Sequence, residues 1–253
     1  MTELIALIFD VDGTIADTER DGHRLAFNRA FAEAGLDWDW SVSLYGELLA
    51  IAGGKERIRF YLQQYQPEFD PHSDLDQFIV ELHAAKTKHY QQLVASGAIP
   101  LRTGVNRLIQ EAIANGIRLA IATTAALPNV TALLEHALAP DAPQWFELIA
   151  AGDIVPAKKP ASDIYQYVLQ VMGLSAADCI AIEDSHQGLQ ATDGVSLKTV
   201  ITVNDYTRTQ DFAGAVLVLN HLGEPEQPFT VLAGNAGDIS YLNLELLRCL
   251  HAK

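Results

Sequence analysis

The chain has 253 residues, 49% of them hydrophobic, so it is long enough to bury a full core. Its formal net charge of -15 excludes binding to nucleic acid or anionic lipid through broad basic surfaces, because such binding needs clustered Lys and Arg. The sequence has neither an apolar run of about 18 residues nor a basic, signal-like start, so we expect no membrane partner and a cytoplasmic location.

The first informative segment is residues 8–14, IFDVDGT, an apolar run that ends in two aspartates spaced by one residue. The pattern predicts a buried strand with Asp10 and Asp12 at its carboxyl end. Gly13 permits a sharp turn there, and Thr14 offers a hydroxyl and an amide to an anion. An ordinary Asp-Gly turn is the alternative. The segment indicates a site for phosphate and a metal ion.

Residues 17–95 carry helical apolar stripes and no convincing buried strand, which indicates a helical domain inserted between 1–16 and 96–253. Within it, residues 19–28 are unusually polar for the start of a helix. The segment 53–57, GGKER, predicts a flexible loop with cations beside a helix N-terminus, a place suited to bind phosphate.

From residue 104 onward, helical stripes alternate with short apolar runs. The expected helices lie around 105–113, 164–172 and 242–250, and the expected strands are 117–122, 179–182, 199–203 and 216–219. This alternation predicts an α/β fold with a doubly wound, Rossmann-like parallel sheet covered on both faces. Ligands bind beyond the carboxyl ends of such strands, where Asp10, Thr123 and Asp184 fall.

Four segments in chain order carry a resemblance to a known family: 10–14, Thr123, Lys159-Pro160 and Glu183-Asp184. By these segments the sequence resembles the haloacid dehalogenase superfamily of phosphohydrolases over most of its length. The resemblance supports an α/β core with a helical cap inserted after the first motif. Such a cap closes over the site, excludes water and carries specificity.

The resemblance implies hydrolysis of a phosphate ester with Asp10 as the nucleophile, which forms an aspartyl-phosphate. Asp12 would protonate the leaving oxygen and later deprotonate the attacking water. The dehalogenases proper lack this second acid, so its presence favours phosphoryl transfer.

Lys159 would, by the same resemblance, neutralise the nucleophile and the phosphate together, and we expect the neighbouring Lys158 to be solvated. Thr123 is placed to donate its hydroxyl to a phosphate oxygen. Thr124 is the alternative donor if the strand is one residue longer, and two threonines in a plain turn would be the interpretation without the other motifs.

Several carboxylates around a phosphate dianion require a hard cation with oxygen ligands, and Mg²⁺ fits this requirement. The expected ligands are Asp10, Asp184 and the backbone carbonyl of Asp12. Glu183 ranks below them, as a direct or water-mediated ligand, because strand alternation turns it away from Asp184. An acidic turn at the end of a strand is the alternative for Glu183 and Asp184.

Residues 17–28 follow the pattern D-T-E-x-D-G-H-R-x-A-F-N and, with the loop 53–57, resemble the CbbY-type branch of β-phosphoglucomutase-like phosphatases. That branch removes a phosphate from xylulose-1,5-bisphosphate, an inhibitor of Rubisco. The resemblance favours a substrate-binding role for four residues of the expected cap: Glu19, His23, Arg24 and Lys55. A solvated charged face is the alternative for the cap cations.

Three functions stay open. The leading one is a Mg²⁺-dependent phosphatase for a small phosphorylated sugar, expected as a monomer. The second is a phosphosugar mutase, or a phosphatase for another small sugar phosphate, because the core motifs do not separate hydrolysis from transfer. A non-catalytic binding protein is disfavoured by the intact set Asp10, Asp12, Lys159 and Asp184.

Overall fold

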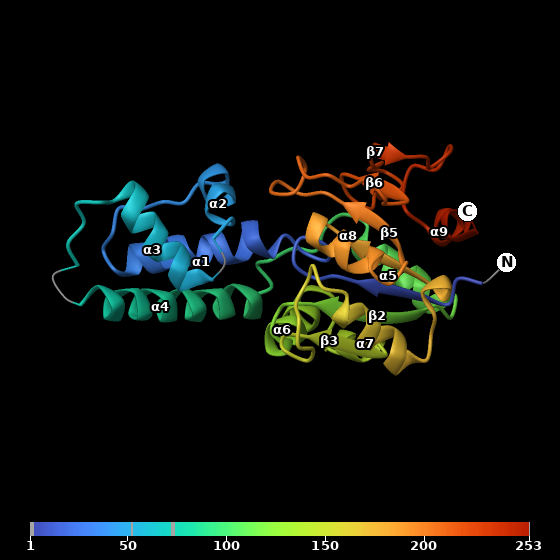
Figure 1. The fold of residues 1–253 in the computed structure, drawn as a ribbon, viewed down its shortest axis with the longest axis horizontal. Coiled ribbons are helices and arrows are strands. Elements are labelled where there is room, and N and C mark those ends of the chain that lie inside the picture. The colour runs from blue at the N-terminus through green and yellow to red at the C-terminus, as the bar shows by residue number, and fades with distance from the viewer. Residues whose placement is uncertain (1–2, 52, 72–73, 253) are drawn as a thin grey trace. The chain divides into compact units, whose positions relative to one another are not determined.

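The computed structural model describes residues 3–51, 53–71 and 74–252, which divide into two compact units (Figure 1). One unit comprises the chain up to Asp17 and from Pro100 onward, and the other spans Thr18–Ile99. The first unit is the α/β core and the second is helical. The helical unit begins one position after the expected boundary at residue 17 and ends four positions after the one at residue 95.

The core unit contains a seven-stranded sheet in the order β3-β2-β1-β4-β5-β6-β7. Its strands are β1 (Ala6–Phe9), β2 (Arg118–Thr123), β3 (Leu148–Ala151), β4 (Cys179–Glu183), β5 (Lys198–Thr202), β6 (Leu217–Leu219) and β7 (Val231–Gly234). Neighbouring strands are parallel except for the antiparallel pair β6 and β7. The strand order reverses at β1, which defines a doubly wound sheet, so the predicted fold class is confirmed.

Helices cover both faces of this sheet (Figure 1). The core helices are α5 (Val105–Ala114), α6 (Leu127–Ala137), α7 (Asp163–Met172), α8 (His186–Asp193) and α9 (Leu244–Ala252), with short turns η2 (Ala142–Trp145) and η3 (Ala176–Asp178). Helices α7 and α8 pack together on one face, and α5 contacts α9 on the other. Small side chains of the central strands, including Ala120, Ala122 and Ala181, meet the apolar stripe of α7. This fit lets the helix lie close over the strand ends that form the site.

The sequence analysis does not predict β3 and β7. Strand β3 is a four-residue edge strand, and β7 is a four-residue antiparallel edge strand whose residues are all exposed. Their sequences, LIAA and VLAG, are apolar but only four residues long, and so short an apolar run does not distinguish a strand from other structure.

The helical unit contains the π-helical turn η1 (Thr18–His23) and helices α1 (Arg24–Glu33), α2 (Val42–Leu48), α3 (Gly54–Tyr65) and α4 (Leu75–Ala95). Its core is rich in aromatic rings packed at tilted or edge-on angles, among them Phe27, Phe31, Trp38, Trp40 and Tyr61. Such pairs add stability beyond the area they bury. None of the described helices combines the length and apolarity that a membrane crossing requires.

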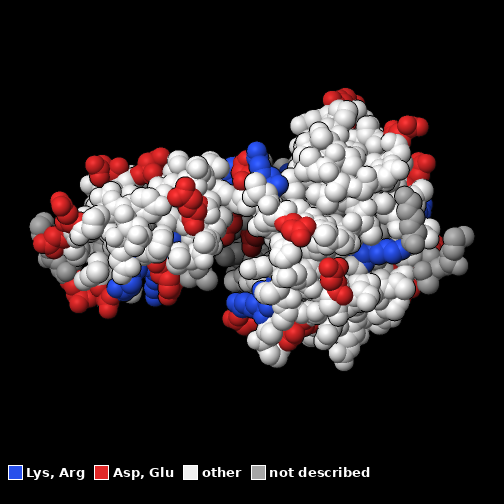
Figure 2. Space-filling model, turned by 45° about the horizontal axis from the view of Figure 1, so that its top comes forward, with Lys and Arg blue, Asp and Glu red and all other residues white. Residues whose placement is uncertain are grey.

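Charged side chains are dispersed over the surface. On the face in Figure 2, Lys and Arg lie in small groups separated by Asp, Glu and uncharged residues. With a net charge of -15, the long-range field does not attract an anion. Any phosphorylated substrate must therefore be held by a few placed cations.

Arg102 anchors the place where the chain leaves and re-enters the core unit. Ala16 and Leu101 form a β-bridge there, and the Arg102 guanidinium pairs with Asp17 at 3.3 Å. The same guanidinium donates to four backbone carbonyls: Gly13, Thr202 at 2.8 Å, Val203 at 2.5 Å and Asn220 at 3.0 Å. One side chain thus ties the turn after β1 to the ends of β5 and β6.

We expect Arg102→Met to lower the free energy of unfolding by about 3 kcal/mol or more, because it leaves several backbone carbonyls without their donor. Urea unfolding followed by circular dichroism measures this change. Arg208→Met is the matched control, since Arg208 is exposed and its guanidinium pairs with the nearby Asp205, and it should cost less than about 1 kcal/mol. Equal losses in the two variants would contradict the anchoring role.

Candidate active site

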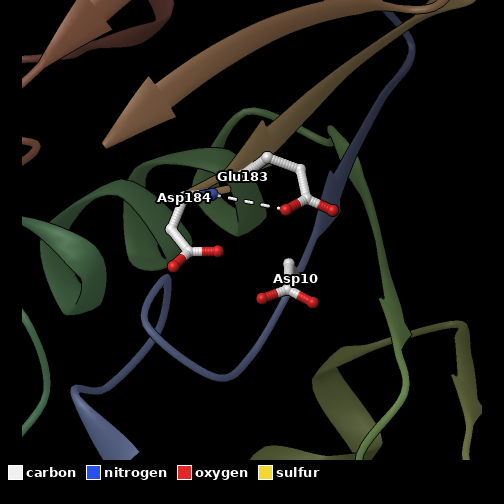
Figure 3. Close-up of side chains that lie close together, drawn as sticks. All are labelled: Asp10, Glu183 and Asp184. Atoms are coloured by element: carbon white, nitrogen blue, oxygen red, sulfur yellow. Dashed lines mark hydrogen bonds between the residues drawn. The ribbon is translucent and has the colours of Figure 1, made fainter. Parts of the chain in front are cut away.

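Three carboxylates meet at the carboxyl edge of the sheet (Figure 3). Asp10 follows β1, Glu183 ends β4 and Asp184 comes next, and the parallel pairing of Phe9 with Ile182 brings the two strand ends together. Each residue offers one carboxylate oxygen, and these oxygens lie within 4.8 Å of one another. All three residues are buried. The structure therefore brings together Asp10, Asp184 and Glu183, three of the metal ligands predicted from the sequence.

Lys159 lies inside this cluster. Its Nζ donates to Asp10 Oδ1 at 2.6 Å, to Glu183 Oε1 at 2.5 Å and to the carbonyl of Ala122 at 2.9 Å. Burial by itself would lower the pKa of Lys159, but the carboxylates of Asp10 and Glu183 outweigh it and hold that pKa well above its usual range. Lys159 is therefore a permanent cation beside Asp10.

Glu183 reaches the carboxylate cluster from β4. Strand alternation does place its side chain on the α7 face, but the carboxylate still reaches the cluster, and its Oε2 accepts from the Asp184 amide at 3.3 Å. Tyr165 donates its hydroxyl to Glu183 Oε1, and Gly188 of α8 leaves the space, since a Cβ there would collide with the carboxylate. Burial and the charge of Asp10, opposed by Lys159, raise the pKa of Glu183 to about 7.

The cluster has more negative charge than Lys159 can balance. Burial and the neighbouring carboxylates of Asp10 and Glu183 raise the pKa of Asp184 well above its usual range. Buried oxygen donors of this kind suit a hard divalent cation, which would favour their ionised forms. The residues present therefore fit the Mg²⁺ ion that the sequence predicts.

The turn after β1 carries Asp12, which is half-buried. Gly13 has a φ of +83°, and a Cβ at this position would collide with the Asp184 carboxylate, so the turn requires glycine. The hydroxyl of Thr14 is buried and has no hydrogen-bond partner among the described residues. A backbone carbonyl from Asp12 fits the oxygen-donor set of the cluster.

Strand β2 ends at Thr123, which is buried, while Thr124 is exposed. The Thr123 hydroxyl accepts from the Ala125 amide at 3.2 Å and keeps its own proton for another acceptor. Thr123 is thus the better placed of the two predicted phosphate donors. Lys158 is an exposed residue paired with Asp153 at 2.9 Å, outside the buried cluster.

A second polar group lies within the helical unit. Glu19 accepts from the Tyr45 hydroxyl at 2.6 Å, and that hydroxyl accepts from Arg57 at 2.8 Å. Burial would raise the pKa of Glu19, but His23, Tyr45 and nearby cations outweigh it and lower that pKa. Glu19 is therefore held ionised inside the helical unit.

His23 stacks on Tyr90 with ring centroids 3.9 Å apart and shares a 2.9 Å hydrogen bond with Lys86. Because an ammonium can only donate, His23 Nδ1 is the acceptor and the neutral ring carries its proton on Nε2. Burial, with the charge of Lys86 and opposed by Glu19, lowers the pKa of His23 to about 4. The ring thus presents a neutral N–H donor.

The sequence analysis missed Tyr45 and Lys86, and it left open whether Arg57 is solvated. A signal existed for Lys86, which occupies a position of the α4 stripe otherwise formed by buried apolar and aromatic residues such as Leu82 and Tyr90. Arg57 is buried and donates to the carbonyls of Leu48 and Ile51, so it is not part of a solvated face.

Arg24 and Lys55 lie apart from these contacts. Arg24 donates to the carbonyls of Arg20 and Trp40, both at 3.2 Å, which gives it a role in holding the helical unit. Lys55 is exposed in the first turn of α3, directly after the turn at Gly53 and Gly54. Binding of substrate by Arg24 and Lys55 stays a prediction.

We expect Lys86→Met to raise the pKa of His23 above its value of about 4, because burial still lowers this pKa but one of the cations that disfavour the protonated ring is removed. NMR titration of the imidazole resonances measures the change. His221 of the core unit is the control: burial and the charge of Arg102 lower its pKa, and that pKa should be the same in both proteins. An unchanged His23 titration would contradict the assigned donor.

The family is shown by sequence. Residues 6–192 match the haloacid dehalogenase-like hydrolases, and the chain belongs to this family. It is 46% identical over 246 residues to protein CbbY of Cupriavidus necator, covering 97% of this chain and 96% of the relative. It is also 47% identical over 213 residues to CbbY of Rhodobacter capsulatus, covering 84% of this chain and 91% of the relative.

Solved structures agree with these relatives. A mutant CbbY of Rhodobacter sphaeroides in complex with xylulose-(1,5)bisphosphate matches with a TM-score of 0.71 and 44% identity, over 87% of this chain and 95% of that one. The predicted class of enzyme, a phosphatase-type hydrolase, is confirmed by the family and by these relatives. The metal, the exact substrate, the cytoplasmic location and the monomeric state stay predictions.

Proposed function

We propose that the chain is a Mg²⁺-dependent phosphatase that removes one phosphate from a small sugar bisphosphate, in its sharpest form xylulose-1,5-bisphosphate. The observation that carries the reaction is the buried cluster in which Lys159 bridges Asp10 and Glu183 beside Asp184. Support for the substrate comes from the R. sphaeroides CbbY structure, which holds xylulose-(1,5)bisphosphate.

The chemistry starts at Asp10. Lys159 Nζ donates to Asp10 Oδ1 at 2.6 Å, and a carboxylate anion at this position can attack phosphorus without losing a proton first. An O–P bond to Asp10 forms while the bond between phosphorus and the sugar oxygen breaks. Asp12 gives its proton to that sugar oxygen, then takes a proton from water as the water attacks phosphorus and releases Asp10. The products are the dephosphorylated sugar position and inorganic phosphate.

Negative charge on the phosphoryl oxygens must be balanced for this step. Asp10, Asp184 and the backbone carbonyl of Asp12 would hold Mg²⁺, with Glu183 as a further ligand. The bound ion would neutralise the phosphoryl oxygens. The Thr123 hydroxyl would donate to the same oxygens, and the positive charge of Lys159 beside Asp10 would offset their negative charge.

The second phosphate would bind residues of the helical unit. Lys55 offers a cation in the first turn of α3, beside the helix N-terminus, and His23 offers a neutral N–H. Arg24 completes the proposed phosphate-binding set, while Glu19, an ionised carboxylate, would accept a hydrogen bond from a hydroxyl of the sugar. Binding energy gained at this remote phosphate serves to orient the reacting one.

We expect wild-type enzyme with Mg²⁺ to release phosphate from a panel of sugar mono- and bisphosphates, fastest from xylulose-1,5-bisphosphate. Asp10→Asn should lower kcat by at least about a thousandfold, because the amide is a poor nucleophile, and a chelator should abolish release in wild type. Colorimetric phosphate release and chromatography of the sugars measure both. Release confined to other sugars would refute the substrate, and interconversion of phosphosugars without release would favour a mutase.

We expect Lys55→Ala to raise KM about tenfold for a bisphosphate and to leave KM for a monophosphate nearly unchanged, since only the bisphosphate loses a charged hydrogen bond. Steady-state kinetics on both substrates measure the difference. Lys88→Ala, at another exposed lysine of the helical unit, is the control and should change neither value. Equal effects of Lys55→Ala on both substrates would remove this second phosphate site.

A further inference from the structure

Asn204 contacts the carboxylate cluster but has no part in the reaction described above. It lies two residues after the end of β5, and the register of Glu183 with Ile201 places the ends of β4 and β5 side by side. The Asn204 amide Nδ2 donates to Asp184 Oδ2 at 2.7 Å. A neutral donor therefore holds one oxygen of this carboxylate.

The orientation of the Asn204 amide is fixed by its other contacts. Asn204 Oδ1 accepts from the backbone amide of Tyr206 at 2.9 Å, and a backbone N–H can only donate. The oxygen of the amide must therefore face Tyr206, which leaves Nδ2 for Asp184. The backbone amide of Asn204 donates in turn to the Thr207 hydroxyl at 3.0 Å, so the turn that carries the side chain is closed locally.

The backbone before Asn204 is also held. Arg102 donates to the carbonyls of Thr202 and Val203, the two residues that precede it, and to the carbonyl of Gly13. A Cβ on Gly13 would collide with both Asp184 and the Asn204 amide. Turn, amide and carboxylate thus pack against one another without spare space.

The chemistry of the donor matters. A lysine or arginine at this position would neutralise Asp184 and compete with a metal ion, while an apolar residue would leave the carboxylate free to rotate. An uncharged amide fixes one oxygen and keeps the negative charge available for a cation.

We propose that Asn204 is a positioning residue that holds Asp184 in the orientation for binding a divalent cation. This inference rests on the proposed function, because it takes Asp10 and Asp184 as metal ligands. It adds a residue outside the four motifs that define the resemblance.

The test is a titration of the full chain with Mn²⁺ in the absence of substrate, in which electron paramagnetic resonance measures the binding. Asn204→Ala, and Asn204→Leu, which keeps the volume but not the donor, should each weaken Mn²⁺ binding by about tenfold or more. Asn220→Ala is the matched control. Its side chain accepts from the amides of His221 and Thr230, away from the cluster, and its loss should leave Mn²⁺ affinity within about twofold of wild type.

Two results would overturn the positioning role alone: wild-type affinity in a folded Asn204 variant, or equal weakening by Asn220→Ala. Circular dichroism establishes which variants are folded, and the isosteric Leu variant serves if the Ala variant is not. A wild-type chain that binds no Mn²⁺ would overturn both this role and the proposed function. Mn²⁺ binding that Asp184→Asn leaves intact would likewise overturn both.

Discussion

The buried ammonium of Lys159 is the interaction on which the catalytic end of the core depends. Burying a single carboxylate without a partner costs several kcal/mol, and three at one sheet edge would force at least one of them to take a proton. Lys159 bridges two of the three, and Tyr165 donates to one of that pair. The arrangement leaves more carboxylates than ammonium groups at this sheet edge, so a bound cation would balance the remaining negative charge.

In the helical unit, a charged carboxylate is stabilised without a direct ion pair. There the half-buried carboxylate of Glu19 accepts from the Tyr45 hydroxyl, which in turn accepts from Arg57. The cation and the anion are separated by a neutral hydroxyl, so neither is quenched by direct pairing. Lys86 similarly donates a hydrogen bond to a neutral partner, the His23 ring, and its ammonium lies over the rings of Phe27 and Tyr90. Hydrogen bonds to neutral groups thus fix the orientation of Glu19, Arg57 and Lys86 and leave their charges in place.

The sequence predicts the fold class and the carboxylate cluster because both produce patterns within short stretches of sequence. Apolar runs that end in Asp10, Thr123 and Asp184 reveal strand ends, and parallel strands bring those ends to one edge. Tyr165 produces no such pattern, since it occupies a position in the apolar stripe of α7 and looks like any core aromatic residue. Asn204 does fit this pattern, because it is the first residue after the predicted strand 199–203. A search for polar residues at strand ends would therefore have identified it.

The β-bridge between Ala16 and Leu101 has an evolutionary consequence. Because the two ends of the insertion are fastened to each other within the core, the core closes over the gap as if a short loop stood there, and the entropy of loop closure grows only slowly with the length inserted. The inserted segment can therefore become longer or shorter, or be replaced by another domain, without disturbing the carboxylate cluster. An enzyme with such a core can acquire new substrates through mutations confined to the inserted segment.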